Sequence, residues 1–383
     1  MESKEIRYNE EKKEIQFIGK ITSFKFYTLL FSALKEHYKI NGKEAIPIFS
    51  FVFVDEFDAL VIPNIISIGL IIKRFHQGKR IPLKLLNTSA TYFLDSINFF
   101  KHVGEKDFIG ETIIENGFEK NISKKIGLDI FEFEKGYLGF YNNVGIQKSL
   151  NPNHKIQIFD NCSFEYYKNY SDEEIPPDKL EKVLDTIRTK KFNELKPKVK
   201  KYFYKTIHYK HREKDDVDSI ISILTEIISN SILYSDSHCF AMLQSKDDKT
   251  KISISDIGIG LKGSLKYKPN FDFHISKTYK GDHKEKLKNY LLIFDALQYS
   301  MSKHRENLFS LLKLIIKKGG KMRIHYDDVQ VVFTTNRCGN CDIIPEKCYK
   351  CLLNNLSNDK LISPIRFFDW TFKGMHIEVE LDF

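Results

Sequence analysis

The sequence lacks an apolar run long enough to cross a membrane. Its longest uncharged apolar stretch, ALVIPNIISIGLII at 59–72, has 14 residues and contains Pro63, whereas a spanning helix needs roughly 20. The opening residues, MESKEIRYNEEKKE, also lack the apolar core of a secretory signal. We therefore expect a cytoplasmic protein with no membrane partner.

Cysteine is scarce except in one short segment, which argues against a disulfide framework. Four of the six cysteines lie between 338 and 351, and only Cys162 and Cys239 stand apart. Such crowding is typical of a metal site in a reducing compartment. The sequence also lacks internal repeats and low-complexity tracts. Its length of 383 residues predicts two folded domains of ordinary size.

Acidic residues are nearly missing from segment 188–214, which accounts for the basic character of the chain. The segment holds eleven Lys or Arg against two acidic residues, a net charge of +9 that equals that of the whole protein. Aromatic residues are interleaved with the lysines, a pattern suited to phosphate backbones and stacked bases. A solvated helix and a docking site for an acidic protein are the alternatives.

The first part of the chain alternates predicted strands and helices with short connections. They are a hairpin at 6–19, a helix at 24–38, a strand at 46–54, a helix at 63–74, a strand at 81–86 and a helix at 90–104. Strand 46–54 reads IPIFSFVFV without alternation, so we expect it to be buried on both faces. This order predicts an α/β domain over 1–160, followed by a linker and basic helical segment over 161–214.

A second domain is predicted over 215–383, and five of its residues form a pattern with chemical meaning. Glu226 and Asn230 share one face of a helix at 216–235, and a strand at 250–256 ends in Asp256, followed by Gly258 and Gly260. An Asn oxygen suits Mg²⁺, a Glu can hold an attacking water, and an Asp can accept a hydrogen bond from an exocyclic amine. Glycine lets a ligand approach the backbone and allows positive φ. The alternative is that Asp256 only ends a strand and Glu226 only faces solvent.

The order Glu-x-x-x-Asn, then Asp-x-Gly-x-Gly, resembles the N box and first glycine box of the GHKL ATPase superfamily, which has the Bergerat fold. IKKGGKMRIHY at 316–326 and FKGMHIEVELDF at 372–383 resemble later landmarks of that superfamily. The resemblance implies an α+β two-layer sandwich that binds ATP and Mg²⁺. It makes Glu226 the catalytic base, Asn230 the Mg²⁺ ligand and Asp256 the adenine reader. Gly258 and Gly260 would line the adenine pocket.

The sequence departs from that family pattern in four places. Tyr234 stands where His is common, and Met375 stands where a Thr helps to hold adenine. Residues 302–312 contain no glycine although the second glycine box is expected there, and the Lys-rich loop 262–288 lacks a glycine-dense lid. The resemblance therefore favours ATP binding and leaves open whether ATP is hydrolysed.

The first domain resembles, more loosely, the STAS-like domains of anti-sigma-factor antagonists. The resemblance rests on the strand ending at Val54, the helix start at Pro63 and the segment IPLKLLNTSATYFLDSINFF at 81–100. In those domains the helix start carries a Ser that is phosphorylated, but here Asn64 follows Pro63 and Ser67 comes one turn later. A plain α/β docking domain is the alternative.

The clustered cysteines have the spacing of a metal site. Two Cys-x-x-Cys pairs, separated by six residues, are formed by Cys338, Cys341, Cys348 and Cys351. Four thiolates complete a tetrahedral Zn²⁺ site, and an iron–sulfur cluster is the alternative. We therefore predict a zinc-knuckle insertion at 336–355, between late strands of the second domain.

Three functions follow as hypotheses. The first is an ATP-binding regulatory protein whose nucleotide state controls docking of its domains or of a protein partner, with homodimer formation as an open alternative. The second is a serine kinase of the anti-sigma type. The third is a nucleic-acid-binding protein with a degenerate nucleotide site, acting through 188–214.

Overall fold

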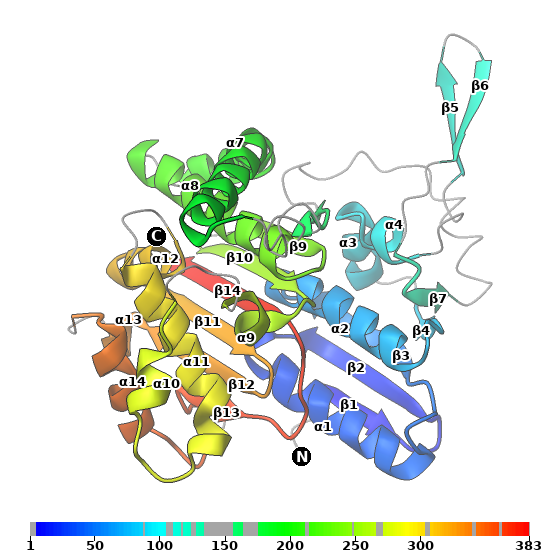
Figure 1. The fold of residues 1–383 in the computed structure, drawn as a ribbon. Helices are drawn as coiled ribbons and strands as arrows, with labels where there is room; N and C mark the ends of the chain where they lie inside the picture. Colours follow the sequence, from blue (N-terminus) through cyan, green and yellow to red (C-terminus); the bar gives the residue numbers. More distant parts are fainter. Residues whose placement is uncertain are drawn as a thin grey trace. The chain divides into compact units, whose positions relative to one another are not determined.

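The chain divides into two units, Met1–Ile156 and Gln157–Phe383, in the computed structural model (Figure 1). The structure describes residues 5–86, 89–104, 110–115, 118–123, 128–133, 156–163, 175–210, 214–246, 249–265, 271–302, 307–338, 342–359 and 362–382. Both units combine helices with sheets, so the predicted mixed α/β class is confirmed.

The main sheet of the first unit has the strand order β1-β2-β3-β4-β7. Its strands are β1 (Ile6–Asn9), β2 (Glu14–Ile21), β3 (Ile48–Phe57), β4 (Ile81–Lys84) and β7 (Phe131–Phe133). β1 and β2 form the predicted antiparallel hairpin, and β2, β3, β4 and β7 run parallel. Parallel neighbours need crossover connections, which the helices between these strands supply. A separate antiparallel pair joins β5 (Gly110–Glu115) to β6 (Phe118–Ser123).

The helices of the first unit follow the predicted order with one difference. They are α1 (Ser23–Asn41), the short η1 (Ala59–Val61), α2 (Ile62–Phe75), α3 (Ser89–Ser96) and α4 (Phe99–Val103). The segment predicted as one helix at 90–104 is two helices, because Asn98 has a left-handed backbone with a φ of 63°. Asn tolerates that conformation better than most residues, and it ends the helical path of α3.

Strand β3 is buried on both faces, as its apolar run predicts, only in its first part. Phe49, Ser50 and Phe51 are consecutive and buried, whereas Phe53 is 48% exposed. The pairing of β2 with β3 shifts register between Gln16 and Ile18, which face Ser50 and Phe53 respectively. The extra residue in β3 reverses which face the later side chains occupy, and Phe53 is exposed although it belongs to the apolar run.

The second unit is built on a seven-stranded sheet of order β13-β12-β11-β14-β10-β9-β8, with antiparallel pairing throughout its described strands. These strands are β8 (Gln157–Phe159), β9 (Cys239–Lys246), β10 (Lys249–Asp256), β11 (Lys321–Tyr326), β12 (Val329–Thr334), β13 (Ile365–Phe367) and β14 (Met375–Asp382). β8 belongs by sequence to the predicted first domain, yet it pairs with β9. The second unit therefore begins before the predicted linker.

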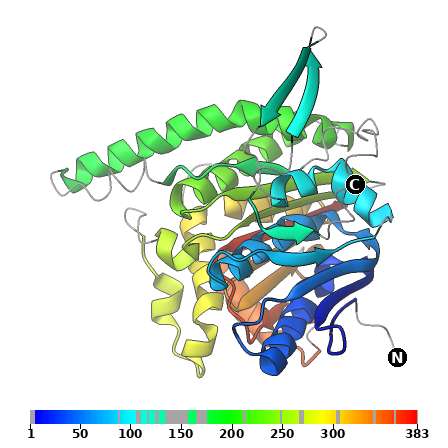
Figure 2. The same cartoon turned by 90° about the vertical axis from the view of Figure 1, so that its right-hand side faces the viewer.

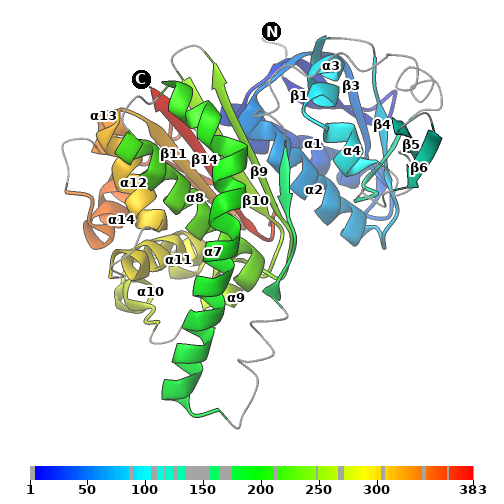
Figure 3. The same ribbon diagram turned by 90° about the horizontal axis from the view of Figure 1, so that it is seen from above.

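Helices of the second unit pack on one face of this sheet (Figure 3). They are α7 (Pro177–Lys210), α8 (Lys214–Tyr234), α9 (Gly260–Leu265), α10 (His274–Thr278), α11 (Lys284–Met301) and α12 (Leu308–Lys317). Along each strand, every second side chain points to this face, and residues such as Ile254, Ile324 and Ile377 share one core with the helices. α8 and the end of β10, which carry the predicted site residues, are thereby anchored in the same core.

The segment predicted as a linker and basic helical segment, 161–214, is largely occupied by α7, a continuous helix of 34 residues (Figure 2). It passes through Pro197, and Leu195, Val199 and Phe203 join the core of the second unit. Apolar residues every four positions give a Lys-rich helix one face that packs. The basic segment is therefore a structural part of the second unit.

The cysteine segment lies between β12 and β13. Its described helices are α13 (Thr335–Cys338) and α14 (Pro345–Asn354), the latter with Pro345 at its first turn. Cys348, Tyr349 and Leu352 of α14 belong to the core of the second unit, so the insertion is fastened to the fold by packing.

Candidate functional site

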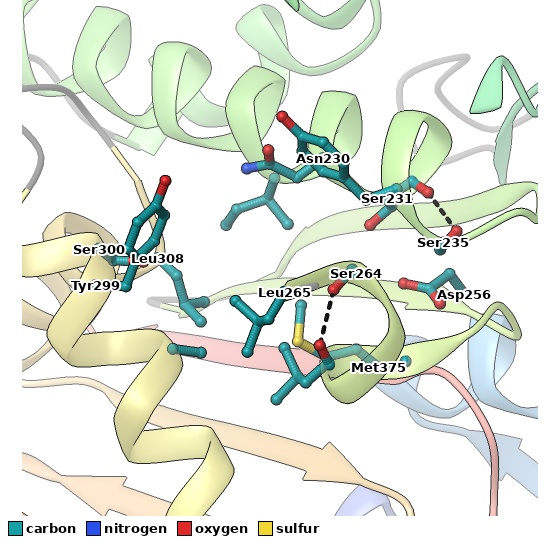
Figure 4. A pocket seen from close by; sticks show the side chains of 15 residues that line it. Asn230, Ser231, Ser235, Asp256, Ser264, Leu265, Tyr299, Ser300, Leu308 and Met375 are labelled. Atoms are coloured by element: carbon teal, nitrogen blue, oxygen red, sulfur yellow. Dashed lines mark hydrogen bonds between the residues drawn. The ribbon is translucent and has the colours of Figure 1, made fainter. Parts of the chain in front are cut away.

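A small cavity lies at the end of β10 (Figure 4). Residues of α8, β10, α9, α11, α12 and β14 line it, and they include Asn230, Asp256, Tyr299 and Met375. Its volume is about 80 Å³, below the roughly 300–1,000 Å³ of typical small-molecule pockets. The fold thus brings Asn230 and Asp256 to one cavity but leaves it narrow.

Asp256 is the buried acid of this cavity. Its Oδ1 accepts a hydrogen bond of 3.1 Å from the amide of Gly258. Burial raises the pKa of its carboxyl to about 6, although hydrogen bonds from the Gly258 and Met375 amides and from the Ser231 side chain oppose the rise. A desolvated acceptor of this kind can recognise a polar group at the edge of a base, and perturbed acids often mark functional sites.

The structure requires glycine at the two positions after Asp256 for different reasons. A Cβ on Gly258 would lie 1.6 Å from the carbonyl oxygen of Ser235, so the close approach of the two backbones requires glycine. Gly258 is not among the residues that line the cavity. Gly260 does line it, has a φ of +67° and would place a Cβ 2.7 Å from the Tyr326 ring. Of the two, Gly260 alone lies where the predicted adenine pocket needs it.

Glu226, the predicted base, is held in a buried ion pair rather than at the cavity wall. Its Oε1 accepts a hydrogen bond of 3.1 Å from Nη1 of Arg188 on α7, and Arg188 also contacts Asp185 at 2.7 Å. The side chains of Arg188 and Glu226 are 12% and 6% exposed. Burial alone would lower the pKa of the Arg188 guanidinium, but the Glu226 and Asp185 carboxylates outweigh it and raise the pKa. Sequence reasoning missed the role of Arg188, because it counted that residue only as part of the basic segment 188–214.

Asn230 lies one turn beyond Glu226 and lines the cavity. Its Nδ2 is 3.5 Å from Glu226 Oε1, a marginal hydrogen bond. Its Oδ1 is buried and makes no hydrogen bond within the part of the chain that the structure describes. Buried polar atoms normally have a partner, so this oxygen marks a position that an ion or ligand would satisfy.

The start of α12 stands where the second glycine box is expected. Asn307 caps this helix, and its Oδ1 accepts hydrogen bonds of 3.0 and 3.1 Å from the amides of Phe309 and Ser310. Open amides at a helix start commonly bind anions, and the cap engages two of them here. This side of the cavity therefore offers less to a phosphate than the family pattern implies.

Three of the predicted metal ligands line a second cavity, of about 260 Å³. They are Cys338 on α13 and Cys348 and Cys351 on α14, whereas Cys341 lies outside the described residues. Among the described residues, no group of three His, Cys, Asp or Glu is arranged to hold a metal ion. The fold brings the three thiols to one cavity without assembling a ligand set from them alone.

The basic face of α7 is exposed, but its aromatic residues are used in packing. Lys190, Lys198 and Lys201 are exposed, whereas Phe203 is buried. Lys200 is engaged, with its Nζ 3.1 Å from Asp218. The arrangement matches the solvated-helix alternative more closely than a surface on which bases would stack.

In the first unit, the helix start of α2 offers no accessible hydroxyl. Asn64 and Ser67 are both fully buried, and Asn64 donates a hydrogen bond of 3.2 Å to the Leu60 carbonyl. A kinase could not reach Ser67 in this conformation.

No protein family, curated protein or solved structure matches the chain. Within the described part of the chain, one helix, α8, is long and apolar enough to cross a membrane over Val217–Tyr234, but 78% of that window is buried within the structure. Its place in the core accounts for its apolar character.

Proposed function

We propose that the second unit is an ATP-binding regulatory module of the GHKL type, with a Bergerat-like fold. One observation carries the proposal: Asn230 and Asp256, on different elements, line the same cavity. The family pattern places an Mg²⁺ ligand and an adenine reader at these two positions.

The residues present fit ATP with Mg²⁺. Asp256 would accept a hydrogen bond from the exocyclic amine of adenine, since it is a buried carboxylate on the cavity wall. Asn230 would hold Mg²⁺ through Oδ1, the buried oxygen that has no partner among the described residues. The metal, when bound, would neutralise phosphate charge.

One feature favours binding over turnover: Glu226 is engaged by Arg188. The amides at the start of α12 are capped by Asn307 and the cavity is narrow, and these two features limit binding and turnover alike. To act as a base, Glu226 would have to leave Arg188 and take a proton from the water that attacks the γ-phosphorus. We therefore propose that nucleotide state controls docking of the domains or of a protein partner, with hydrolysis slow.

Calorimetric titration with ATP and Mg²⁺ tests the proposal. We expect the wild-type protein to bind ATP. Asp256→Ala should bind ATP at least about 30-fold more weakly, because the hydrogen bond between the adenine amine and the Asp256 carboxylate is lost. Asp282→Ala is the matched control, since that acid is exposed and does not line the cavity. Equal binding by wild type and Asp256→Ala, or no binding by wild type, would show the proposal to be wrong.

Single-turnover assays separate binding from hydrolysis. Glu226→Gln keeps the shape of the side chain and removes the base, so any turnover should stop while ATP affinity changes less than threefold, roughly. Turnover that persists in Glu226→Gln would exclude Glu226 as the base.

We propose that the first unit is a STAS-like docking domain. The parallel strands of this unit, which alternate with helices, support the proposal. Because Ser67 is buried, we do not propose it as a phosphorylation site of this unit.

We also propose a structural Zn²⁺ site at the cysteine segment. Cys338, Cys348 and Cys351 share one cavity, and Cys341 would supply the fourth thiolate. Metal analysis should find about one Zn²⁺ per chain, reduced in Cys348→Ser but not in the control Cys162→Ser. A visible absorption band with iron content would instead indicate an iron–sulfur cluster. Reduced thiols of this kind fit a cytoplasmic location.

A further inference from the structure

A groove lies at the start of α11, away from the cavity at its other end. Its volume is about 650 Å³, within the range of roughly 300–1,000 Å³ seen for ligand sites. The turn between α10 and α11, the first turn of α11, α14 and β13 contribute its walls. Lys286 lines the groove and Tyr299 lines the cavity, so the rise of 1.5 Å per residue separates the two by roughly 20 Å.

The groove carries an excess of positive charge. Lys280, Lys286 and Lys350 line it together with His283, against one acid, Asp282. All three lysines are exposed, and no carboxylate among the described residues pairs with them. Lysines that lack an ion-pair partner keep their charge available for an anionic ligand.

Aromatic rings lie beneath two of these charges. The Lys286 ammonium is 5.6 Å from the Phe367 ring centroid, and the Lys350 ammonium is 5.7 Å from that of Tyr349. Tyr279 packs edge-on against Tyr349 with centroids 6.4 Å apart. Phe367 and Tyr279 are only partly buried, so part of each ring faces the groove.

Cation–π contacts at exposed sites are weak, about 0.5–1 kcal/mol, and a phosphate competes well for the same ammonium. A ligand with phosphates and planar rings could therefore draw Lys286 away from Phe367 and leave the ring free for a base to stack on. An acidic peptide would satisfy the lysines but would make no use of the rings. The aromatic floor thus favours a nucleic acid over an acidic protein.

We propose that this groove binds single-stranded nucleic acid, with phosphates at Lys280, Lys286 and Lys350 and a base on Phe367. The proposal does not depend on ATP binding at the cavity. It also differs from binding through 188–214, because the rings of α7 such as Phe203 are used in its own packing.

Fluorescence anisotropy with a labelled single-stranded oligonucleotide of about 12 nucleotides tests the proposal on the full-length protein. Lys286→Ala combined with Lys350→Ala should weaken binding at least about tenfold. It should also make the slope of log K against log salt shallower by about 1.4, the value for two lost phosphate contacts on a single strand. Phe367→Leu should weaken binding about fivefold without changing that slope, because stacking carries no charge.

The matched control is Lys190→Ala combined with Lys198→Ala, which removes the same charge from the exposed face of α7. This pair should bind as wild type does, and circular dichroism should show that each variant is folded. Three results would overturn the proposal: no binding by the wild-type protein, wild-type affinity in the groove pair, or loss of binding in the α7 pair. Displacement of the oligonucleotide by polyglutamate at equal charge would overturn it too and would indicate an acidic polypeptide as the ligand.

Discussion

The two ends of α11 carry sites of opposite character. At the C-terminal end, Tyr299 and Asp256 belong to a narrow cavity of about 80 Å³ that holds a buried acid. At the N-terminal end, Lys286 and Lys350 belong to a groove of about 650 Å³ whose charges are exposed. A buried polar group discriminates by the cost of leaving it unpaired, whereas exposed charges attract by sign and are screened by salt. Helix α11 therefore connects a cavity suited to selective recognition with a groove suited to attracting an anionic ligand.

The largest difference in stability between the two ends of α11 should come from glycine substitutions. Gly258→Ala puts a Cβ against the Ser235 backbone, which cannot move without disturbing the cavity. We expect it to lower the free energy of unfolding by about 4 kcal/mol or more. Gly281→Ala, beside the groove, meets the hydroxyl and two ring carbons of the Tyr279 side chain, which can turn away, so its cost should stay near about 1 kcal/mol. Urea unfolding of both variants measures the contrast, and equal losses would show that the cavity end is not the more rigid one.

The buried ion pair should give the next largest effect. Arg188→Ala leaves the Glu226 carboxylate buried without its partner, and the free energy of unfolding should fall by about 3–4 kcal/mol. Adding Glu226→Gln should restore most of that loss, because the uncompensated charge is gone. Lys286→Ala on the exposed groove is the control and should change stability by less than about 0.5 kcal/mol. Additive effects of the two mutations in urea unfolding would contradict a coupled pair.

The pH dependence of stability should distinguish the buried acid from the exposed one. Asp256 has a pKa raised to about 6 in the folded protein, so the folded state holds this proton more tightly than the unfolded state. Its contribution to stability is full below pH 4 and is lost as pH rises through about 6, a change of roughly 3 kcal/mol. Asp256→Asn should remove this dependence, so its stability relative to wild type should rise between pH 4 and pH 7. Asp282→Asn should leave this pH dependence unchanged. Unfolding curves between pH 4 and pH 7 check both variants.

The smallest expected effect is a change in ATP affinity when the cavity is widened. Met375 stands on its wall, and Met375→Ala should make room for a base while costing about 1 kcal/mol of stability, since the side chain is only partly buried. ATP affinity should rise about threefold to tenfold by calorimetry. Met301→Ala, a partly exposed methionine on the same α11, is the control and should leave affinity unchanged. Unchanged or weaker binding in Met375→Ala would mean that width does not limit the cavity.

Much of the fold could be predicted from periodicity and turn residues. The hairpin of β1 and β2, the start of α2 at Pro63 and the passage from α8 through β9 to β10 lie close to their predicted bounds. These elements depend on local patterns, such as an apolar stripe or an alternating strand. The break at Asn98 was missed, since a single left-handed residue leaves no mark in the apolar pattern.

The motif order predicted that Asn230 and Asp256 would lie close together, and they line one cavity although they belong to different elements. Contacts outside the motif were less predictable. The partner of Glu226 could not be foreseen, because Arg188 lies on another helix and is 38 residues away in the sequence. The groove escaped notice for the same reason: Lys286, Lys350 and Phe367 are distant in sequence and meet only when α11, α14 and β13 pack together.

The position of Gly258 also bears on how mutational or evolutionary records of this protein should be interpreted. Its missing side chain leaves space for the backbone of Ser235, so selection against any substitution there would act through folding whether or not a nucleotide ever binds. Gly260, which faces the cavity with a positive φ, would be constrained by both backbone and ligand. A saturation library scored separately for abundance and for nucleotide binding should therefore show position 258 intolerant in the first score. Asp256→Asn should be tolerated in the first score and not in the second.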